Sequence, residues 1–192
     1  MRRFDREYAE LRDAIAAGEL GRISLLNLKH RNAHTLPGFV DTMMVYDSAV
    51  HEVDAIHYFL GEEVTGVQVI LPVAGPRAEE GQHDPMLILF RTASGVLAHI
   101  NTNWLTPFKA RNVTVATRGK YVMGDLLTRQ VTEYFGQQPD GSYSTRMLNS
   151  WPAEPLKKEL EAFAHAIRSG EPPAVTGEDG LRNLEVALRC LG

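Results

Sequence analysis

Four polar residues recur along residues 47–60 at a spacing that could support acid–base chemistry. Asp47, His51, Asp54 and Tyr58 follow one another at intervals of four, three and four residues, which places them on one stripe of a helix. A histidine exchanges a proton near neutral pH, and a carboxylate one turn earlier orients it or raises its pKa. The helix dipole also favours the negative charge of Asp47 near the N-terminus of a helix. The pattern therefore indicates a general acid–base pair, Asp47 and His51.

A structural interpretation of the same residues stays open. Asp47 could serve only as the N-cap of the helix, and an Asp–His pair at this spacing is common on solvated helix faces. His57 lies nearer the apolar side, which favours a hydrogen-bonded structural histidine. The His and Asp spacing matches no zinc motif such as HExxH, so we expect no metal site.

A second polar cluster, His30-Arg31-Asn32, stands at the end of a predicted strand. Loops that follow strands often present side chains to a ligand, and these residues could bind hydroxyl groups or an anion. Alternatively, they are polar loop residues without a role. Arg2 and Arg3 precede the first predicted helix and could be no more than linker charges.

Helical periodicity places these residues on the chain. Asp5 is a suitable N-cap for a first helix that ends near Gly18, and residues 22–30 read as a strand. Residues 31–46 read as a loop, and a second helix runs from Asp47 to Leu60 with Gly61 as its stop.

The middle of the chain reads as strands with short connections. The predicted strands are 64–73, 86–90, 95–104, 111–117, 121–126 and 131–135, with loops at 74–85 and 136–155. Thr92 to Gly95 form a hairpin turn between two of them. Two helices close the chain; the first is marked by Leu156, Leu160, Phe163 and Ile167, and the second by Leu181, Leu184, Leu188 and Leu191.

Short strand connections require antiparallel pairing, because a parallel crossover needs about a dozen residues. We therefore predict an α+β fold for residues 1–192 as one domain: a mostly antiparallel open sheet with helices packed on one face. Residues 95–104 alternate between an apolar and a mixed side, so the other face of the sheet could meet water or another sheet.

Composition excludes several functional classes. The 192 residues are 44% hydrophobic and 23% charged, which is typical of a globular domain. A net charge of −4 with scattered Lys and Arg argues against nucleic acid. The single Cys190, the lack of an apolar run near ~18 residues and the lack of a signal peptide predict a cytoplasmic protein without a membrane. No GxGxxG motif follows any predicted strand.

The chain resembles the C-terminal domain of the glucose–fructose oxidoreductase/inositol dehydrogenase (Gfo/Idh/MocA) family along its whole length. Four segments in the family's order carry the resemblance, and DSAVHEVD within the second is the most specific motif. These segments are RRFDREYAELRDAIAAGELGRI (2–23), DSAVHEVDAIHYFLGEE (47–63), NWLTPFKARNVTVATRGK (103–120) and LKKELEAFAHAIRSGEPPAVTGEDGLRNLEVAL (156–188).

The resemblance implies a two-domain enzyme that oxidises a hydroxyl of a cyclic polyol or sugar, most like inositol 2-dehydrogenases. Asp47 and His51 match the family's catalytic pair, His51 being the acid–base that takes the hydroxyl proton. Asn32 and Arg2 match substrate-site residues, and His30 is a third candidate. The resemblance also implies a homodimer or homotetramer through the sheet face.

The resemblance places NAD or NADP on an N-terminal Rossmann domain that also carries a lysine in a Glu-Lys-Pro motif. This sequence has no such motif, so we expect a fragment without a cofactor site, inactive alone. Two alternatives remain open. The NWLTP stretch resembles members acting on nucleotide-linked amino sugars, and the chain could instead be a non-catalytic ligand-binding or dimerisation module with the same fold.

Overall fold

The computed structural model describes residues 2–32, 45–70, 86–149 and 154–191. The helical elements are η1 (Arg2–Phe4), α1 (Arg6–Ala16), η2 (Val45–Ala49), α2 (Val50–Leu60), α3 (Pro155–Ser169) and α4 (Gly177–Arg189). The strands are β1 (Ile23–Arg31), β2 (Val64–Ile70), β3 (Met86–Thr92), β4 (Leu97–Asn103), β5 (Ala110–Thr117), β6 (Lys120–Asp125), β7 (Gln130–Phe135) and β8 (Ser144–Asn149). Among the described residues, no helix is long and apolar enough to cross a membrane.

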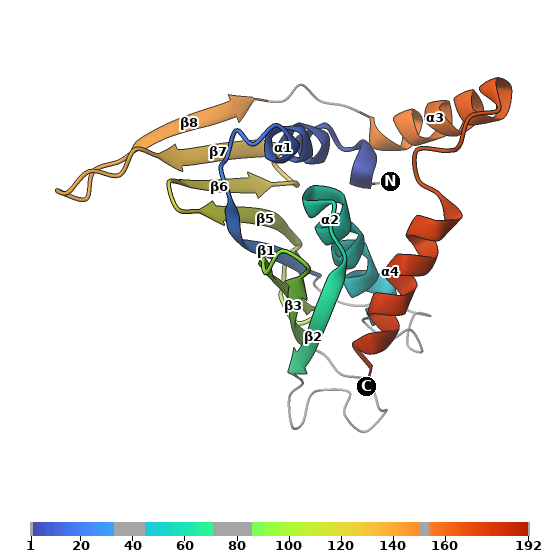
Figure 1. Ribbon diagram of the computed structural model, residues 1–192, viewed down its shortest axis with the longest axis horizontal. Coiled ribbons are helices and arrows are strands. Elements are labelled where there is room, and N and C mark those ends of the chain that lie inside the picture. The colour runs from blue at the N-terminus through green and yellow to red at the C-terminus, as the bar shows by residue number, and fades with distance from the viewer. Residues whose placement is uncertain (1, 33–44, 71–85, 150–153, 192) are drawn as a thin grey trace.

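The strands form one sheet in the order β2-β3-β4-β1-β5-β6-β7-β8 (Figure 1). Neighbours along the chain pair antiparallel, but β1 lies between β4 and β5 and runs parallel to β4. Leu28 of β1 stands beside Ile100 on one side and Val113 on the other. The α+β prediction, with a mostly antiparallel open sheet, is confirmed.

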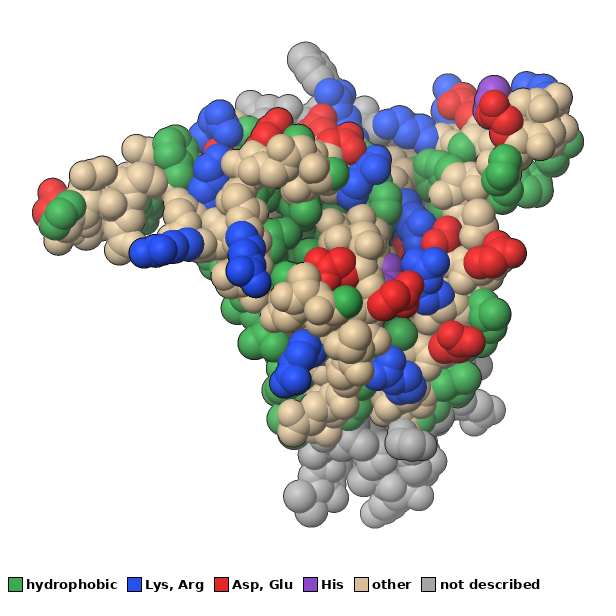
Figure 2. Space-filling view, in the orientation of Figure 1, with side chains coloured by type: hydrophobic (Ala, Val, Ile, Leu, Met, Phe, Trp, Pro, Cys, Tyr) green, Lys and Arg blue, Asp and Glu red, His purple; other side chains and the backbone are tan. Residues whose placement is uncertain are grey.

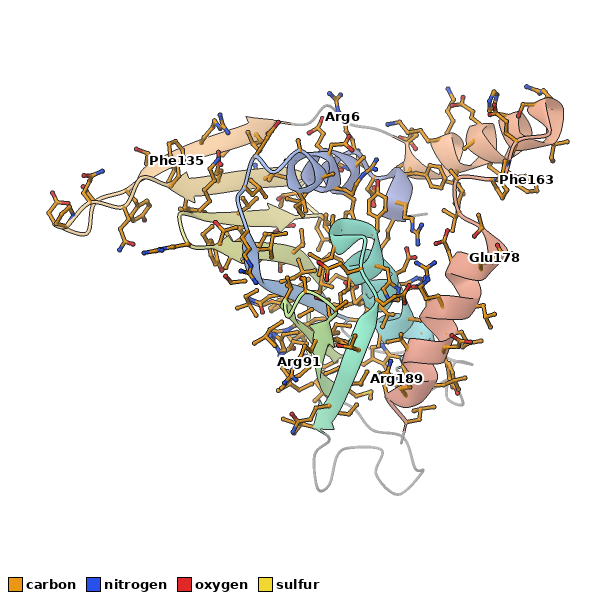
Figure 3. The ribbon with its side chains drawn as sticks, in the orientation of Figure 1. Arg6, Arg91, Phe135, Phe163, Glu178 and Arg189 are labelled. Atoms are coloured by element: carbon orange, nitrogen blue, oxygen red, sulfur yellow. The ribbon has the colours of Figure 1, made fainter. Side chains whose placement is uncertain are left out.

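Three helices cover one face of the sheet. α2 packs against both α1 and α4, and its stop is Gly61 in a left-handed conformation at φ 63°, as predicted. α3 is different, since it extends away from the sheet in Figure 1 and has no buried residue. Figure 3 shows Phe163 on this helix, far from the strands.

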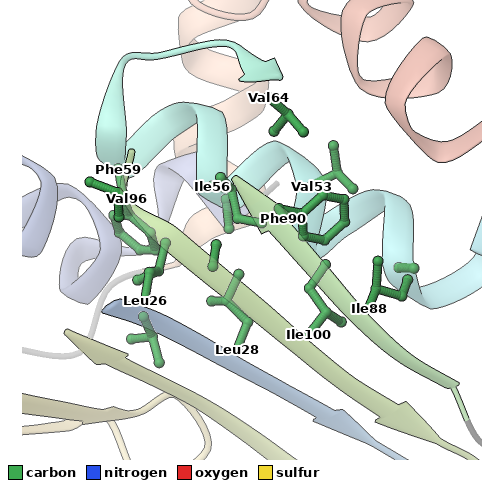
Figure 4. Close-up of a cluster of buried hydrophobic side chains, with 14 of the residues drawn as sticks. Leu26, Leu28, Val53, Ile56, Phe59, Val64, Ile88, Phe90, Val96 and Ile100 are labelled. Atoms are coloured by element: carbon green, nitrogen blue, oxygen red, sulfur yellow. The ribbon is translucent and has the colours of Figure 1, made fainter. Parts of the chain in front are cut away.

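The core lies between α2 and the centre of the sheet (Figure 4). Alternate residues of the strands point into it, so that Leu26, Leu28, Ile88 and Ile100 are all 0% exposed. Val53 and Ile56 meet them from α2, also at 0% exposed. This apolar layer fixes α2, and with it the polar residues at its start, relative to the ends of β1 and β5.

One prediction about the strands is wrong. Residues 136–155 were expected to be a loop, but Ser144–Asn149 form β8, which pairs antiparallel with β7. Gly136 and Gly141 adopt positive φ values of 67° and 85° in the connection. Residues 144–148 are exposed on this edge strand, so the segment carries no alternation of buried apolar residues to reveal it. The predicted loop at 74–85 lies outside the described residues, as does most of that at 31–46.

Gly124 on β6 allows close packing with β5. A Cβ atom there would stand 2.9 Å from Cγ1 of Val113, a short and stiff side chain that is 2% exposed. We expect Gly124→Ala to lower the free energy of unfolding by about 1–3 kcal/mol, measured by urea denaturation. Gly119→Ala is the matched control, because a Cβ at Gly119 meets nothing within 4 Å, and it should change stability by less than about 0.5 kcal/mol. Equal effects of the two variants would contradict this explanation.

Candidate functional site

A row of polar side chains interrupts the core face of the sheet at the end of β1. His30 on β1 is in register with Thr102 on β4 and with Arg111 on β5. His30 is 4% exposed and Thr102 is 0% exposed. The next row on the same face is wholly apolar and consists of Ile100, Leu28 and Val113. Buried polar groups need partners, so this row marks a candidate site.

Glu52 of α2 reaches this row and is 1% exposed. Its Oε1 accepts a hydrogen bond from Arg2 of η1 and lies 2.8 Å from Nδ1 of His30. Burial alone would raise the pKa of Glu52, but the Arg2 guanidinium and His30 together lower it below its usual range. Glu52 is therefore an ionised carboxylate that joins segments 50 and 22 residues away in sequence.

The ionised Glu52 and the Arg2 guanidinium contact the same nitrogen of His30, because Nη2 of Arg2 lies 2.7 Å from Nδ1. A carboxylate only accepts and a guanidinium only donates, so Glu52 favours a protonated Nδ1 and Arg2 favours an unprotonated Nδ1. Burial lowers the pKa of His30, and Glu52 offsets only part of that effect, so the ring is neutral at pH 7. Arg2 and His30 were both predicted to bind substrate. Both are close to the site, but each uses polar atoms on Glu52.

Sequence reasoning missed Glu52, although a signal exists. Glu52 precedes Ile56 by four residues and Phe59 by seven, which puts a carboxylate on the buried stripe of the helix. Charged residues are rarely buried unless they are paired, so this position alone indicates a buried ion pair. The partners themselves cannot be read from the helix.

The start of the second helix differs from the prediction. Asp47 does not cap a regular α-helix but lies within the π-helical turn η2, and α2 begins at Val50 with Ala49 as its N-cap. π-Turns hydrogen-bond one residue further along the chain than α-turns and occur often at functional sites. The Asp47 carboxylate accepts a hydrogen bond from Ser48 Oγ at 3.0 Å.

His51 is exposed and follows that turn. The surrounding protein and the nearby Arg2 guanidinium lower the pKa of His51, while Glu52, Asp47 and Asp54 act in the opposite direction. Among the described residues, no hydrogen bond joins Asp47 to His51. The pair thus consists of a neutral, accessible imidazole with a carboxylate close enough to influence its charge.

The other half of the predicted polar stripe is structural. Arg3 binds Asp54 through Nη2 at 2.5 Å and through Nε at 3.1 Å, and its guanidinium lies 5.5 Å from the centre of the Tyr58 ring. Asn183 of α4 also donates to Asp54, at 2.6 Å. In Figure 2, charged side chains of both signs lie next to one another over α2 and α4. Arg3 therefore has a structural role, because its ion pair with Asp54 connects η1 to α2 and, through Asn183, to α4.

His57 was predicted to be a hydrogen-bonded structural histidine, and this is confirmed. It is 5% exposed, and its Nδ1 lies 2.7 Å from Oδ1 of Asn183.

Asn32 follows β1 directly, and Arg111 holds it. Nη2 of Arg111 donates to Oδ1 of Asn32 at 2.9 Å, while Nη1 donates to the backbone oxygen of Arg31 at 2.8 Å. Burial and the charge of Arg2 lower the pKa of Arg111. Sequence reasoning missed Arg111, but its register with Val113 and Val115 on the apolar side of β5 was a usable signal.

Neither a metal site nor a dinucleotide site is formed by the residues described. No group of three or more His, Cys, Asp or Glu residues among them could hold a metal ion. A dinucleotide needs a glycine-rich loop between a strand and a helix. Helices follow strands at β1–α2 and β8–α3, where the sequence between the elements contains one glycine, Gly38, and none, respectively. The described strands and helices therefore provide no glycine-rich loop for NAD or NADP.

A shallow hollow of about 690 Å³ lies on the opposite face of the sheet, away from the polar row. Tyr121, Met123 and Tyr134 are among the residues that line it, and Tyr121 and Met123 are 43% and 39% exposed. It contains none of the candidate site residues, so we assign the chemistry to the polar row and to the start of α2.

Comparisons with known proteins agree on one family. Residues 8–122 match the pattern that defines the GFO/IDH/MocA C-terminal domain. Inositol 2-dehydrogenase 4 of Saccharopolyspora erythraea is 38% identical over 184 residues, covering 94% of this chain and 53% of that protein. Inositol 2-dehydrogenase of Arthrobacter sp. is 53% identical over 100 residues, covering 52% of this chain and 30% of that protein.

The same family likeness is visible in solved structures. The structure of a probable dehydrogenase from Thermotoga maritima has 26% sequence identity and a TM-score of 0.76, covering 97% of this chain and 59% of the other. The chain thus spans about half the length of the curated relatives that it matches along most of its own length.

Proposed function

Because the chain belongs to the GFO/IDH/MocA C-terminal domain family, we propose that it is the substrate-binding and catalytic half of an NAD(P)-dependent oxidoreductase. Its substrate in this proposal is a cyclic polyol or sugar, and inositol is the first candidate. The observation that carries the proposal is the neutral, accessible His51 beside Asp47, next to a buried polar row, in a chain 38% identical to an inositol 2-dehydrogenase.

The reaction assigned to this chain is proton transfer. His51 takes the hydroxyl proton of the substrate, which it can do near pH 7 because its lowered pKa leaves the imidazole unprotonated. The nearby Asp47 carboxylate stabilises the imidazolium that forms. Asn32, Arg2 and His30 bind the other hydroxyl groups. Bound outside this chain, a nicotinamide cofactor supplies the hydride acceptor.

Two exposed apolar rows support the presence of a second half. Leu156, Leu160, Phe163 and Ile167 on α3 are 55–69% exposed, and hydrophobic side chains are visible along this helix in Figure 2. Leu181, Leu184 and Leu188 on α4, and Leu191 just after it, are 39–58% exposed. Rows of this size normally pack against protein. The curated relatives are about twice as long as this chain, so the residues that they have in addition could pack against these two rows.

The open face of the sheet supports self-association. Leu97, Leu89 and Tyr121 on this face are 51%, 38% and 43% exposed, and the hollow described above lies beside Tyr121. Two sheets with apolar faces pack face to face with a separation of about 10 Å between them. We propose a homodimer or homotetramer formed through this face. Light scattering of the purified protein measures its mass, and a monomer would contradict this part of the proposal.

The test of the proposed function uses the complete gene product that contains these 192 residues. Reduction of NAD or NADP is followed with myo-inositol, its isomers, aldoses and nucleotide-linked amino sugars. We expect turnover with a cyclic polyol or sugar and with one of the two cofactors. Turnover with nucleotide-linked amino sugars alone would replace the substrate class. No turnover with any compound would favour a non-catalytic ligand-binding module.

A further inference from the structure

We propose that Arg111 is a positioning residue that locks Asn32 with its amide NH₂ group presented to the ligand. The site would then offer only hydrogen-bond donors at that corner and would select a ligand oxygen that accepts. This inference rests on the proposed function, since it assigns Asn32 to the substrate site.

The first step is that a hydrogen bond anchors the backbone of Asn32 to the end of β4. Its N–H donates to the carbonyl of Asn103 at 2.9 Å. Arg111 is equally fixed, because Nη1 donates to the carbonyls of Arg31 at 2.8 Å and of Ala110 at 2.9 Å. The backbone of Asn32 and the guanidinium of Arg111 are therefore both held in place by hydrogen bonds.

The second step is chemical. A guanidinium has only donors, so the Asn32 atom that faces Arg111 at 2.9 Å must be the amide oxygen. The NH₂ group consequently points the other way. Among the described residues, none accepts a hydrogen bond from it. An amide held in this way presents two donors and no competing acceptor.

The third step is the charge of this corner. No described carboxylate lies within salt-bridge distance of Arg111, whereas Arg2 is paired with Glu52. Burial and the charge of Arg2 lower the pKa of Arg111, and they outweigh the opposite effects of Glu52, Tyr8 and Asp47. Thr102 adds a hydroxyl that is buried and without a partner among the described residues, two strands from Arg111 in the same row. A hydroxyl or carboxylate oxygen of a ligand matches these groups.

Asn32→Asp separates positioning from structural support. The substitution keeps the shape, lets Arg111 form a salt bridge, and replaces the donor NH₂ by an acceptor. We expect an unchanged or higher Tm together with a KM for the substrate raised about tenfold or more, and little change in kcat. A lower Tm with an unchanged KM would overturn the inference.

The link between the two residues is tested by a double-mutant cycle in the complete gene product. Arg111→Met should raise KM about tenfold in the wild-type background and should have no further effect on KM in an Asn32→Ala background. Arg6→Met, which removes an exposed guanidinium on α1, is the control and should leave KM unchanged. An equal effect of Arg111→Met in both backgrounds would overturn the inference.

A readout without substrate separates this inference from the proposed function. NMR relaxation of the Asn32 side-chain NH₂ should report a rigid amide in the wild type and a mobile amide in Arg111→Met. A mobile amide in the wild type would overturn the inference, even in an active enzyme. A rigid amide without any turnover would uphold the geometry and contradict the proposed function alone.

Discussion

Replacing His51 by alanine in the complete gene product is expected to lower kcat by about 10² or more, because general base catalysis contributes 10²–10⁴. The imidazole is accessible at the start of α2, and its lowered pKa leaves it unprotonated near pH 7. Without it, the substrate hydroxyl must lose its proton to water as the hydride leaves. Steady-state kinetics with the best substrate from the panel measures the change.

The control for this variant is His165→Ala. His165 is exposed on α3 and pairs with Glu171, away from the polar row, so its removal should leave kcat unchanged. Tm values of both variants show whether the fold is intact. If His51→Ala folds normally and turns over substrate at the wild-type rate, His51 has no part in the mechanism.

The pH profile gives a second reading of His51. Its pKa in the folded protein is lowered from 6.5, and the base must be unprotonated to act. The value of kcat/KM should therefore be level at neutral pH and should fall on acidification, with a midpoint below 6.5. A midpoint above that value would mean that Asp47 controls the charge of His51 more strongly than burial and Arg2 do.

Replacing Glu52 by glutamine is expected to lower the free energy of unfolding by about 3–5 kcal/mol, as for a buried ion pair that loses one partner. Glutamine has nearly the same shape, but it leaves the Arg2 charge without compensation in the core. It also removes the carboxylate that lies 2.8 Å from Nδ1 of His30. Urea denaturation measures the loss.

An exposed pair provides the comparison. Glu10 binds Arg6 on the surface of α1, and Glu10→Gln should change stability by no more than about 0.5 kcal/mol. A Glu52→Gln variant as stable as Glu10→Gln would show that the buried pair does not stabilise the fold.

The stability of the wild type should also depend on Glu52 at low pH. Its folded-state pKa is lowered below the ordinary value of 4.5, so the unfolded chain binds the proton first. The contribution of Glu52 is thus present above pH 4.5 and is lost as the pH falls through the lower, folded-state pKa. The Glu52→Gln variant should lack this part of the acid dependence.

Local sequence determined most of the elements in this protein. Residues 22–30 predicted β1, the apolar period before Gly61 predicted α2, and the turn at Thr92 to Gly95 predicted the β3–β4 hairpin. These features depend on neighbours a few residues apart, whose propensities and burial period the sequence records. The position of His57 near the apolar side of its helix sufficed to identify it as structural.

Tertiary structure decided which polar residues act together. β1 lies between β4 and β5 because long-range packing places it there, and only that insertion brings His30 between Thr102 and Arg111. Glu52 looks like an isolated charge on a helix until η1 and β1 supply Arg2 and His30. A buried charge must find partners somewhere in the fold, but helical periodicity shows only that it is buried. The sequence thus identified Asp47 and His51 as chemical candidates, and the folded chain alone decided that Asp54 and Tyr58 serve the structure instead.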